Sequence, residues 1–263
     1  MIKLLPLILS AAPITAFTTP SGVALTTAGC RNGVARRNPR SLSAIKEATF
    51  GMGCFWEPAE SLLQTPGVLS TTVGYTGAPA SKPPPTYDTV CFGNDYVEAV
   101  RVVYDDSVLD YGTLLDEFFE VQKPKLSRQY SSIVFVDGED EEEVFQRWKS
   151  SKMENEVKRS DGLPYEIVAS EPLSKFYRAE EYHQNYWAKQ RVRAGLGVLL
   201  IAGASGAYDE FGGGAIGNLE VGGLGFDSIC NAVFLVGAAW MILERLIVRD
   251  VRELKSGDLI LEL

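Results

Sequence analysis

The sequence is poor in the residues that build metal sites and disulfide frameworks. Its 263 residues include one histidine and four cysteines, and the cysteines have neither Cys-x-x-Cys spacing nor scaffold density. A basic patch is missing too, because residues 1–47 carry +5 of a total charge of −9 and the remainder therefore carries −14. These deficits argue against a zinc site and against nucleic acid as a partner. They favour a free thiol in a reducing compartment.

Apolar residues are plentiful enough for a packed core, at 46% of the chain. Strand-like patterns alternate along the sequence with helix-like patterns, and this interleaving predicts an α/β domain. The predicted strands are 48–52, 68–75, 97–104, 133–136 and 165–169, and the predicted helices are 57–64, 111–120, 139–159 and 179–193.

Residues 1–46 have the composition of a targeting presequence in two parts. A signal-like part, 1–16, carries Lys3 before a short apolar run. A transit-like part, 17–46, contains four Arg, seven Ser or Thr and no acidic residue. This combination resembles the presequences of plastid proteins in algae with secondary plastids, so a plastid location is expected, with mitochondrial or secretory location as the alternative. Cys30 would then be removed with the presequence.

Cys54 lies where the predicted strand 48–52 turns into the predicted helix 57–64. Gly53 allows a tight exit from the strand, and Pro58 suits the first turn of a helix. Unpaired N–H groups and the positive end of the helix dipole favour the thiolate at such a turn, and the thiolate is the nucleophilic form. The alternative is a buried cysteine in a core turn.

Several short motifs around Cys54 occur together and in a fixed order. They are Gly-Cys-Phe-Trp at 53–56, Gly-Val at 67–68, Val-Gly-Tyr-Thr-Gly at 73–77, Pro-Thr-Tyr at 85–87, Val-Cys at 90–91, Glu-Ala-Val at 98–100 and Ala-Glu-Glu-Tyr-His-Gln at 179–184. As a set they resemble the A class of peptide methionine sulfoxide reductases. The resemblance implies a domain at 47–193 with a two-layer α/β sandwich and a ferredoxin-like core. It also implies thiol-dependent reduction of methionine-S-sulfoxide, free or in proteins, as oxidative-damage repair.

The resemblance assigns the central chemistry to three consecutive residues. Cys54 matches the nucleophile that attacks the sulfoxide sulfur and becomes a sulfenic acid as methionine leaves. Phe55 and Trp56 match the aromatic side chains that bind the methyl group of the substrate.

Three further residues match groups that act on the sulfoxide oxygen. Glu98 matches the acid that gives the oxygen a proton, a role that needs a carboxyl pKa raised by burial. Its alternative is an edge-strand glutamate facing water. Tyr87, predicted on a loop, and Tyr130 match two tyrosines whose hydroxyls bind the oxygen, and each could instead be a packing aromatic. His183 is interpreted as structural or as lining the site.

The sequence departs from the family pattern in three places. The segment 123–130 is shortened and lacks the usual aspartate. The loop before Glu98 is one residue shorter, and Glu57 replaces a common glycine and adds a negative charge near Cys54. These departures keep two alternatives open: a recognition domain that binds methionine sulfoxide without turnover, and a membrane-attached scaffold.

The Gly-rich tail, 194–263, resembles nothing in the family. Its two apolar stretches, 194–208 and 226–243, approach the roughly 20 residues that cross a bilayer. Basic residues flank the pair on the outside, whereas the loop between them has acidic residues and no Lys or Arg. This pattern is typical of a membrane hairpin through 194–248. The alternative is a pair of Gly-rich helices packed on the soluble domain.

No bound cofactor is implied, so an external thiol must regenerate Cys54. The candidates are thioredoxin, or glutathione with glutaredoxin. Within the mature chain Cys91 is predicted to be a buried core residue, and Cys230 lies in an apolar stretch where thiolate formation is disfavoured. The sequence therefore predicts a one-cysteine cycle in which the external thiol attacks Cys54 directly.

Overall fold

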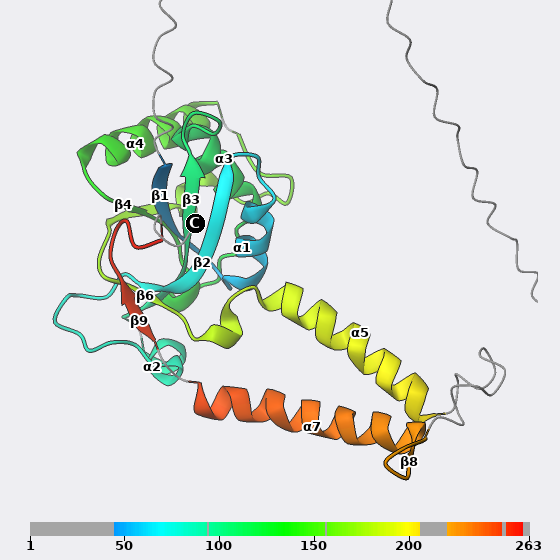
Figure 1. Ribbon diagram of the computed structural model, residues 1–263. Helices are drawn as coiled ribbons and strands as arrows, with labels where there is room; N and C mark the ends of the chain where they lie inside the picture. The colour runs from blue at the N-terminus through cyan, green and yellow to red at the C-terminus, as the bar shows by residue number, and fades with distance from the viewer. Residues whose placement is uncertain (1–44, 94, 156, 206–219, 249–250, 260–263) are drawn as a thin grey trace, which may run out of the picture. The chain divides into compact units, whose positions relative to one another are not determined.

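The structure, a computed structural model, describes residues 45–93, 95–155, 157–205, 220–248 and 251–259. A seven-stranded sheet of order β5-β4-β1-β3-β2-β6-β9 forms its centre (Figure 1). The strands are β1 (Ile45–Met52), β2 (Val68–Thr76), β3 (Val97–Asp105), β4 (Ser132–Val136), β5 (Ala169–Pro172), β6 (Phe176–Arg178) and β9 (Arg252–Leu254). β4 and β5 are parallel, and the other neighbours are antiparallel. The presequence, including Cys30, lies outside the described residues apart from its last two positions.

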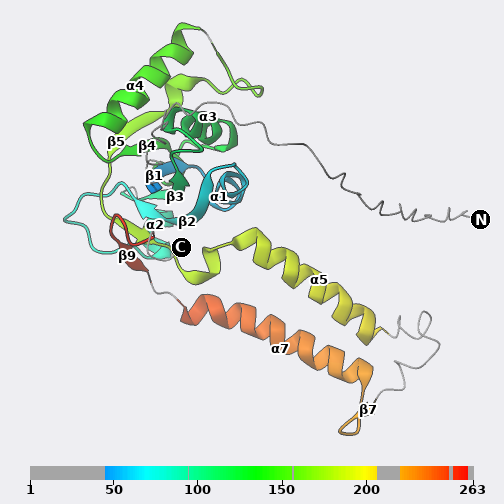
Figure 2. The ribbon, with the colours of Figure 1, turned by 45° about the horizontal axis from the view of Figure 1, so that its top comes forward.

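Six α-helices are found in the described part of the chain. They are α1 (Trp56–Leu63), α2 (Tyr87–Phe92), α3 (Tyr111–Val121), α4 (Glu139–Glu154), α5 (Tyr186–Ala204) and α7 (Phe226–Ile247). Short 3-10 turns occur at Arg128–Tyr130, Tyr165–Ile167 and Glu181–His183, and a small hairpin of β7 (Glu220–Val221) and β8 (Leu224–Gly225) precedes α7. Helices α1 and α3 lie side by side in Figure 2 and contact each other.

The central strand β3 divides the core into two layers because successive side chains point to opposite faces. Val100 and Val102 join the cluster that includes the buried residues of α1 and α3. Ala99 and Val103 join a second cluster on the other face. By this alternation Glu98 belongs to the face covered by α1 and α3.

The C-terminal segment completes the second cluster. Leu254 of β9 and Leu259 are both buried there. Arg101, buried on the same face, donates to the carbonyls of Leu254 and Lys255 at 3.4 and 3.3 Å. Its guanidinium also lies 4.2 Å from the centroid of the Phe176 ring. The chain therefore returns from α7 to the sheet.

The predicted α/β class is confirmed, and an apolar C-terminal helix is present, while the ferredoxin-like assignment stays a prediction. The strand predicted at 165–169 is wrong, because Tyr165–Ile167 is a 3-10 turn and β5 begins at Ala169. Helix α4 ends at Glu154, five residues before the predicted end.

The helix predicted at 179–193 begins later and continues further. Asn185 has φ 50°, a left-handed conformation that cannot continue a helix, so α5 starts at Tyr186. The helix then runs to Ala204 without a break, so the predicted boundary at 193 falls inside it.

Candidate active site

The turn that carries Cys54 requires glycine at the position before it. Gly53 has φ +81°, and a Cβ there would lie 1.9 Å from the carbonyl oxygen of Lys123. The N–H of Lys123 also donates to the carbonyl of Met52 at 2.8 Å, which holds the segment after α3 against the end of β1. Cys54 is half-buried at this junction, two residues before α1 begins.

Burial raises the pKa of the Cys54 thiol above its ordinary value of 9.0. The backbone N–H of Trp56 donates to the sulfur and lowers the pKa, as expected for a cysteine at this turn. The positive charge of Lys125 also lowers it. The negative charges of Glu98 and Glu57 raise the pKa further. The expectation that the turn favours the thiolate is therefore outweighed, chiefly by desolvation.

Glu98 is buried beside this turn. Its carboxylate accepts from the backbone N–H of Phe55 at 3.3 Å and from Nε2 of Gln129 at 2.6 Å. Burial raises the pKa of Glu98 to about 7, although both hydrogen bonds and the charge of Lys125 lower it. The carboxyl can therefore hold a proton near neutral pH and release it to a neighbouring oxygen.

Two aromatic side chains flank the turn, and His183 holds one of them. Phe55 is buried, and its ring centroid lies 5.3 Å from that of His183. Trp56 is half-buried, and its Nε1 donates to Nδ1 of His183 at 3.0 Å. Burial and the charge of Arg245 lower the pKa of His183 to about 4, so the imidazole is neutral and can accept this bond. Tyr186 stacks on the indole at 3.9 Å with an interplanar angle of 6°.

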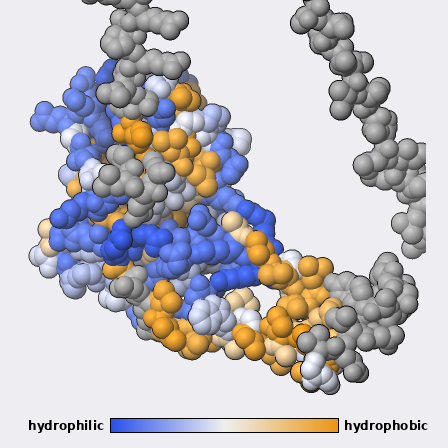
Figure 3. All heavy atoms as spheres, viewed as in Figure 1, coloured by the Kyte–Doolittle hydropathy of each residue, from blue (hydrophilic) through white to orange (hydrophobic). Residues whose placement is uncertain are grey.

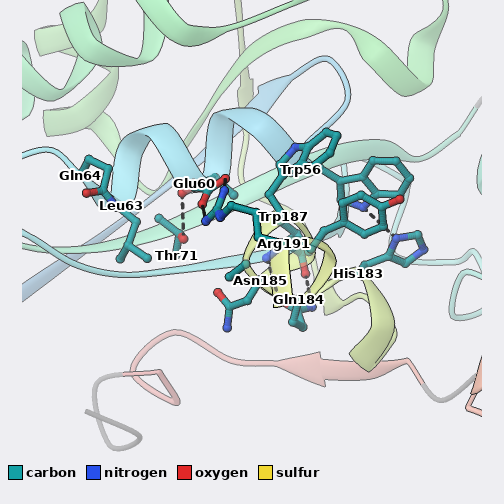
Figure 4. A pocket seen from close by; sticks show the side chains of 14 residues that line it. Trp56, Glu60, Leu63, Gln64, Thr71, His183, Gln184, Asn185, Trp187 and Arg191 are labelled. Atoms are coloured by element: carbon teal, nitrogen blue, oxygen red, sulfur yellow. Dashed lines mark hydrogen bonds and ion pairs between the residues drawn. The ribbon is translucent and has the colours of Figure 1, made fainter. Parts of the chain in front are cut away.

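A cavity of about 190 Å³ lies behind Trp56, between α1 and the first turns of α5. Figure 4 shows Trp56 and His183 at one side of this cavity and Arg191 directed at Glu60. Neither Cys54 nor Glu98 lines it. The cavity therefore lies beside the residues that pack around the Trp56 indole and is separate from the thiol and the carboxyl.

The structure brings four of the predicted site residues together: Cys54, Phe55, Trp56 and Glu98. Tyr130 is half-buried in the 3-10 turn that carries Gln129, with Nζ of Lys125 5.0 Å from its ring centroid.

Tyr87 begins α2 and does not lie on a loop, because Thr86 and Thr89 form a capping box that starts a helix there. Its side chain lies outside the described residues. Cys91, predicted to be buried, is half-buried on α2, and its sulfur accepts from Nε2 of Gln129 at 3.8 Å.

Sequence reasoning missed Gln129 as a partner of Glu98, although it precedes the predicted Tyr130. It also missed the buried pair in which the hydroxyl of Tyr75 donates to Glu180 at 3.0 Å. Gln184, likewise buried, bonds both the N–H and the carbonyl of Val73. The motif at 179–184 was the available signal, because Glu180 and Gln184 in it turn inward and bond residues of β2.

Together these features define a thiol site with acid assistance: a half-buried sulfur, a carboxyl that titrates near neutrality and an aromatic wall. The sequence profile of the family described as peptide methionine sulfoxide reductase matches residues 46–196. A relative from Methanoculleus marisnigri, named peptide methionine sulfoxide reductase MsrA, is 37% identical over 156 residues, 56% of this chain and 92% of the relative. The protein of the same name from Methanothermobacter thermautotrophicus is 37% identical over 162 residues, 58% of this chain and 92% of that one.

Among solved structures, the reduced form of Mxr1 from Saccharomyces cerevisiae matches with 27% identity and a TM-score of 0.46, covering 55% of this chain and 85% of that one. By the family profile and the curated relatives, this chain belongs to the peptide methionine sulfoxide reductase family.

Proposed function

We propose that the protein reduces methionine-S-sulfoxide to methionine, with Cys54 as the nucleophile and Glu98 as the acid. Family membership supports the reaction. The observation that carries the assignment of residues is the hydrogen bond from the N–H of Phe55 to Glu98. It fixes a carboxyl with a pKa of about 7 beside the residue that follows the thiol.

In the proposed step the thiolate of Cys54 attacks the sulfoxide sulfur while Glu98 gives its proton to the sulfoxide oxygen. The attack forms an S–S bond between the cysteine and the substrate; this bond and the substrate S–O bond then break as the protonated oxygen passes to the cysteine sulfur, so thiol plus sulfoxide becomes sulfenic acid plus thioether. The substrate sulfur gains two electrons and the cysteine sulfur loses two. The proton released from the thiol restores Glu98.

Phe55 and Trp56 supply a dry wall for the methyl group in this proposal. The hydrogen bond from Trp56 to His183 and the stack with Tyr186 fix the plane of the indole. The hydroxyls of Tyr130 and Tyr87 are assigned to the sulfoxide oxygen on the family resemblance.

The decisive experiment offers both sulfoxide epimers, free and in a peptide, to the full-length protein with dithiothreitol. We expect turnover of the S epimer and none of the R epimer, and we expect Cys54→Ser to abolish it. Cys91→Ser is the matched control and should retain activity. If both epimers bind and neither turns over, and Cys54→Ser leaves affinity unchanged, the protein is a recognition domain. Absence of turnover, together with a cellular function that survives both Trp56→Ala and Glu98→Gln, would point to the scaffold alternative.

For regeneration we propose that an external thiol attacks the sulfenic acid on Cys54 and displaces water. A second thiol then releases the mixed disulfide and restores the cysteine. The Cys91→Ser, Cys230→Ser double variant should keep full activity with glutathione and glutaredoxin. A Cys54 to Cys91 disulfide that forms at the rate of turnover would overturn this cycle. Thioredoxin in place of glutaredoxin identifies the preferred reductant.

A further inference from the structure

Helices α5 and α7 run antiparallel and side by side in both ribbon views (Figures 1 and 2). Near the end of α5 the backbone of Gly203 lies against the side chain of Cys230 on α7, because a Cβ on Gly203 would lie 2.5 Å from the Cys230 sulfur. At the other end Arg193 of α5 bonds Glu244 of α7 at 2.6 Å. A small residue at the contact and one ion pair therefore join the helices, which we call the helical pair.

The helical pair exposes its apolar side chains. Helix α7 has 22 residues, and only 6% of an apolar stretch of 18 residues within it is buried. Its exposed side chains include Leu235, Val236, Trp240, Ile242, Leu246 and Ile247. In Figure 3 much of the surface of these two helices is hydrophobic, and a separate hydrophobic area lies on the upper part of the molecule. At 1.5 Å per residue α7 is about 33 Å long, which matches the roughly 30 Å of a bilayer core.

Charge is confined to the ends of this surface. Between Asp227, in the first turn of α7, and Glu244 the helix has no charged residue. Glu244 and Arg245 then lie at the same end as Arg193, and Arg249 and Arg252 follow in the sequence. The 21 residues that separate the two helices in the sequence contain Asp209, Glu210 and Glu220 and no Lys or Arg. This asymmetry is typical of a membrane hairpin whose two ends lie on the face where Lys and Arg are enriched.

The basic end of the helical pair is also the end that contacts the site. Tyr186, the first residue of α5, stacks on Trp56, and Arg191 bonds Glu60 of α1. The charge of Arg245 on α7 acts on His183. Seven residues separate Tyr186 from Arg193, which is about 10 Å of helix. The aromatic wall therefore lies within about two helical turns of the level at which charge gives way to apolar surface.

We propose that the helical pair inserts into a lipid bilayer and that the enzyme acts on methionine sulfoxides in segments of other proteins that emerge from the same membrane face. A bilayer accounts for the length, the exposed apolar surface and the charge at one end. The substrate class follows because the site is held at the basic end. This inference rests on the proposed function for its substrate and not for its membrane insertion.

The first test reconstitutes the full-length protein with vesicles of phosphatidylcholine and phosphatidylglycerol and extracts them with alkaline carbonate. We expect the protein to stay with the vesicles. The double variant Leu235→Lys, Val236→Glu should be released, because it places two charges in the middle of α7. Val108→Lys, which alters an exposed apolar residue between β3 and α3, is the matched control and should stay bound. Release of the wild-type protein, or a detergent-free soluble dimer in sedimentation, would overturn the proposal.

The second test compares one methionine-S-sulfoxide peptide in two forms, free in solution and joined to a transmembrane helix in the same vesicles, with the sulfoxide three or fifteen residues from the bilayer. Confinement to one surface should raise kcat/KM for the near anchored form by roughly tenfold or more over the free peptide. The charged double variant should keep its rate on the free peptide and lose the preference. A ratio near one with vesicle-bound enzyme would overturn the substrate class. Absence of turnover on every peptide would instead contradict the proposed function, and carbonate extraction would still decide membrane insertion.

Discussion

The sheet domain, which we define as the seven-stranded sheet with helices α1 to α4, buries its apolar residues, whereas the helical pair exposes them. In the sheet domain Leu114 and Phe118 of α3 are fully buried. In the helical pair Leu235 of α7 is 66% exposed, although α7 is more apolar than α3. The difference supports the proposal that the two regions have different surroundings. The closed core of the sheet domain keeps the Glu98 carboxyl away from water. The helical pair instead exposes a large apolar surface, whose contact with water is unfavourable.

The largest effect should come from replacing the buried carboxyl of the sheet domain, Glu98, and should appear in kcat/KM. Glu98→Gln keeps the shape and the bond from Phe55 but cannot give up a proton, so kcat/KM should fall by about 10²- to 10⁴-fold. Glu57→Gln is the control, because Glu57 also raises the pKa of Cys54 but is exposed, whereas Glu98 is buried. A similar loss in both variants would mean that Glu98 acts only through its charge.

The pH dependence of the rate gives a second test of the roles of Cys54 and Glu98. In the proposed mechanism the reactive form needs the Cys54 thiolate and protonated Glu98; the pKa of Cys54 lies above its ordinary value of 9.0 and that of Glu98 is about 7. Between these values the product of the two fractions is constant. The rate should therefore rise with pH up to about 7, stay level, and fall above the cysteine pKa. In Glu98→Gln the break near 7 should vanish and the rise should continue to the cysteine pKa, as a pH profile of kcat/KM will show.

One truncation made in both regions tests the comparison directly. Leu114→Ala should lower the free energy of unfolding by about 2–5 kcal/mol, because it leaves a cavity in the core. Leu235→Ala should change it by less than about 0.5 kcal/mol, because the side chain has few protein contacts to lose. Urea unfolding of the full-length protein in detergent, followed by near-UV circular dichroism, measures both. Equal losses would mean that α7 is packed as a core helix.

The sequence was sufficient for elements whose signals are local. The Gly-Cys-Phe-Trp turn, the alternating strand β3 and the length of the apolar stretch in α7 were all predictable, because periodicity and turn chemistry reside in neighbouring residues. The bond from Gln129 to Glu98 and the start of α5 after Asn185 were not. They depend on a tertiary contact 31 residues apart and on one left-handed residue. The raised pKa of Cys54 was missed for the same reason, since burial is a property of the fold.

The contact between the two regions predicts a smaller effect. Tyr186→Ala removes the ring that supports Trp56, and such a stack contributes about 0.5–1.5 kcal/mol. The substrate KM should therefore rise by about twofold to tenfold while kcat changes little, because in the proposed mechanism the indole binds the substrate and takes no part in proton transfer. Tyr186→Phe keeps the ring and should behave as wild type. A fall in kcat with an unchanged KM would show that α5 influences Cys54 or Glu98 instead.

The smallest effect should come from Lys125, which stands in the segment where the family pattern has an acidic residue. Its charge lowers the pKa of both Cys54 and Glu98, so Lys125→Ala should raise both and move the level part of the pH profile to higher pH. Lys125 is exposed, and an exposed charge contributes only about 0.2–1 kcal/mol, so the move is less than about one pH unit.

On the acidic limb of the profile the rate of Lys125→Ala should then fall by about twofold to fivefold, because the thiolate fraction falls with the rise in the Cys54 pKa. Lys125→Arg keeps the charge and should retain the profile. Lys123→Ala, which breaks an exposed ion pair with Glu57, offers a second control from the same segment. An unshifted profile in Lys125→Ala would mean that solvent screens this charge from the thiol, and that burial and the N–H of Trp56 alone set the balance at Cys54.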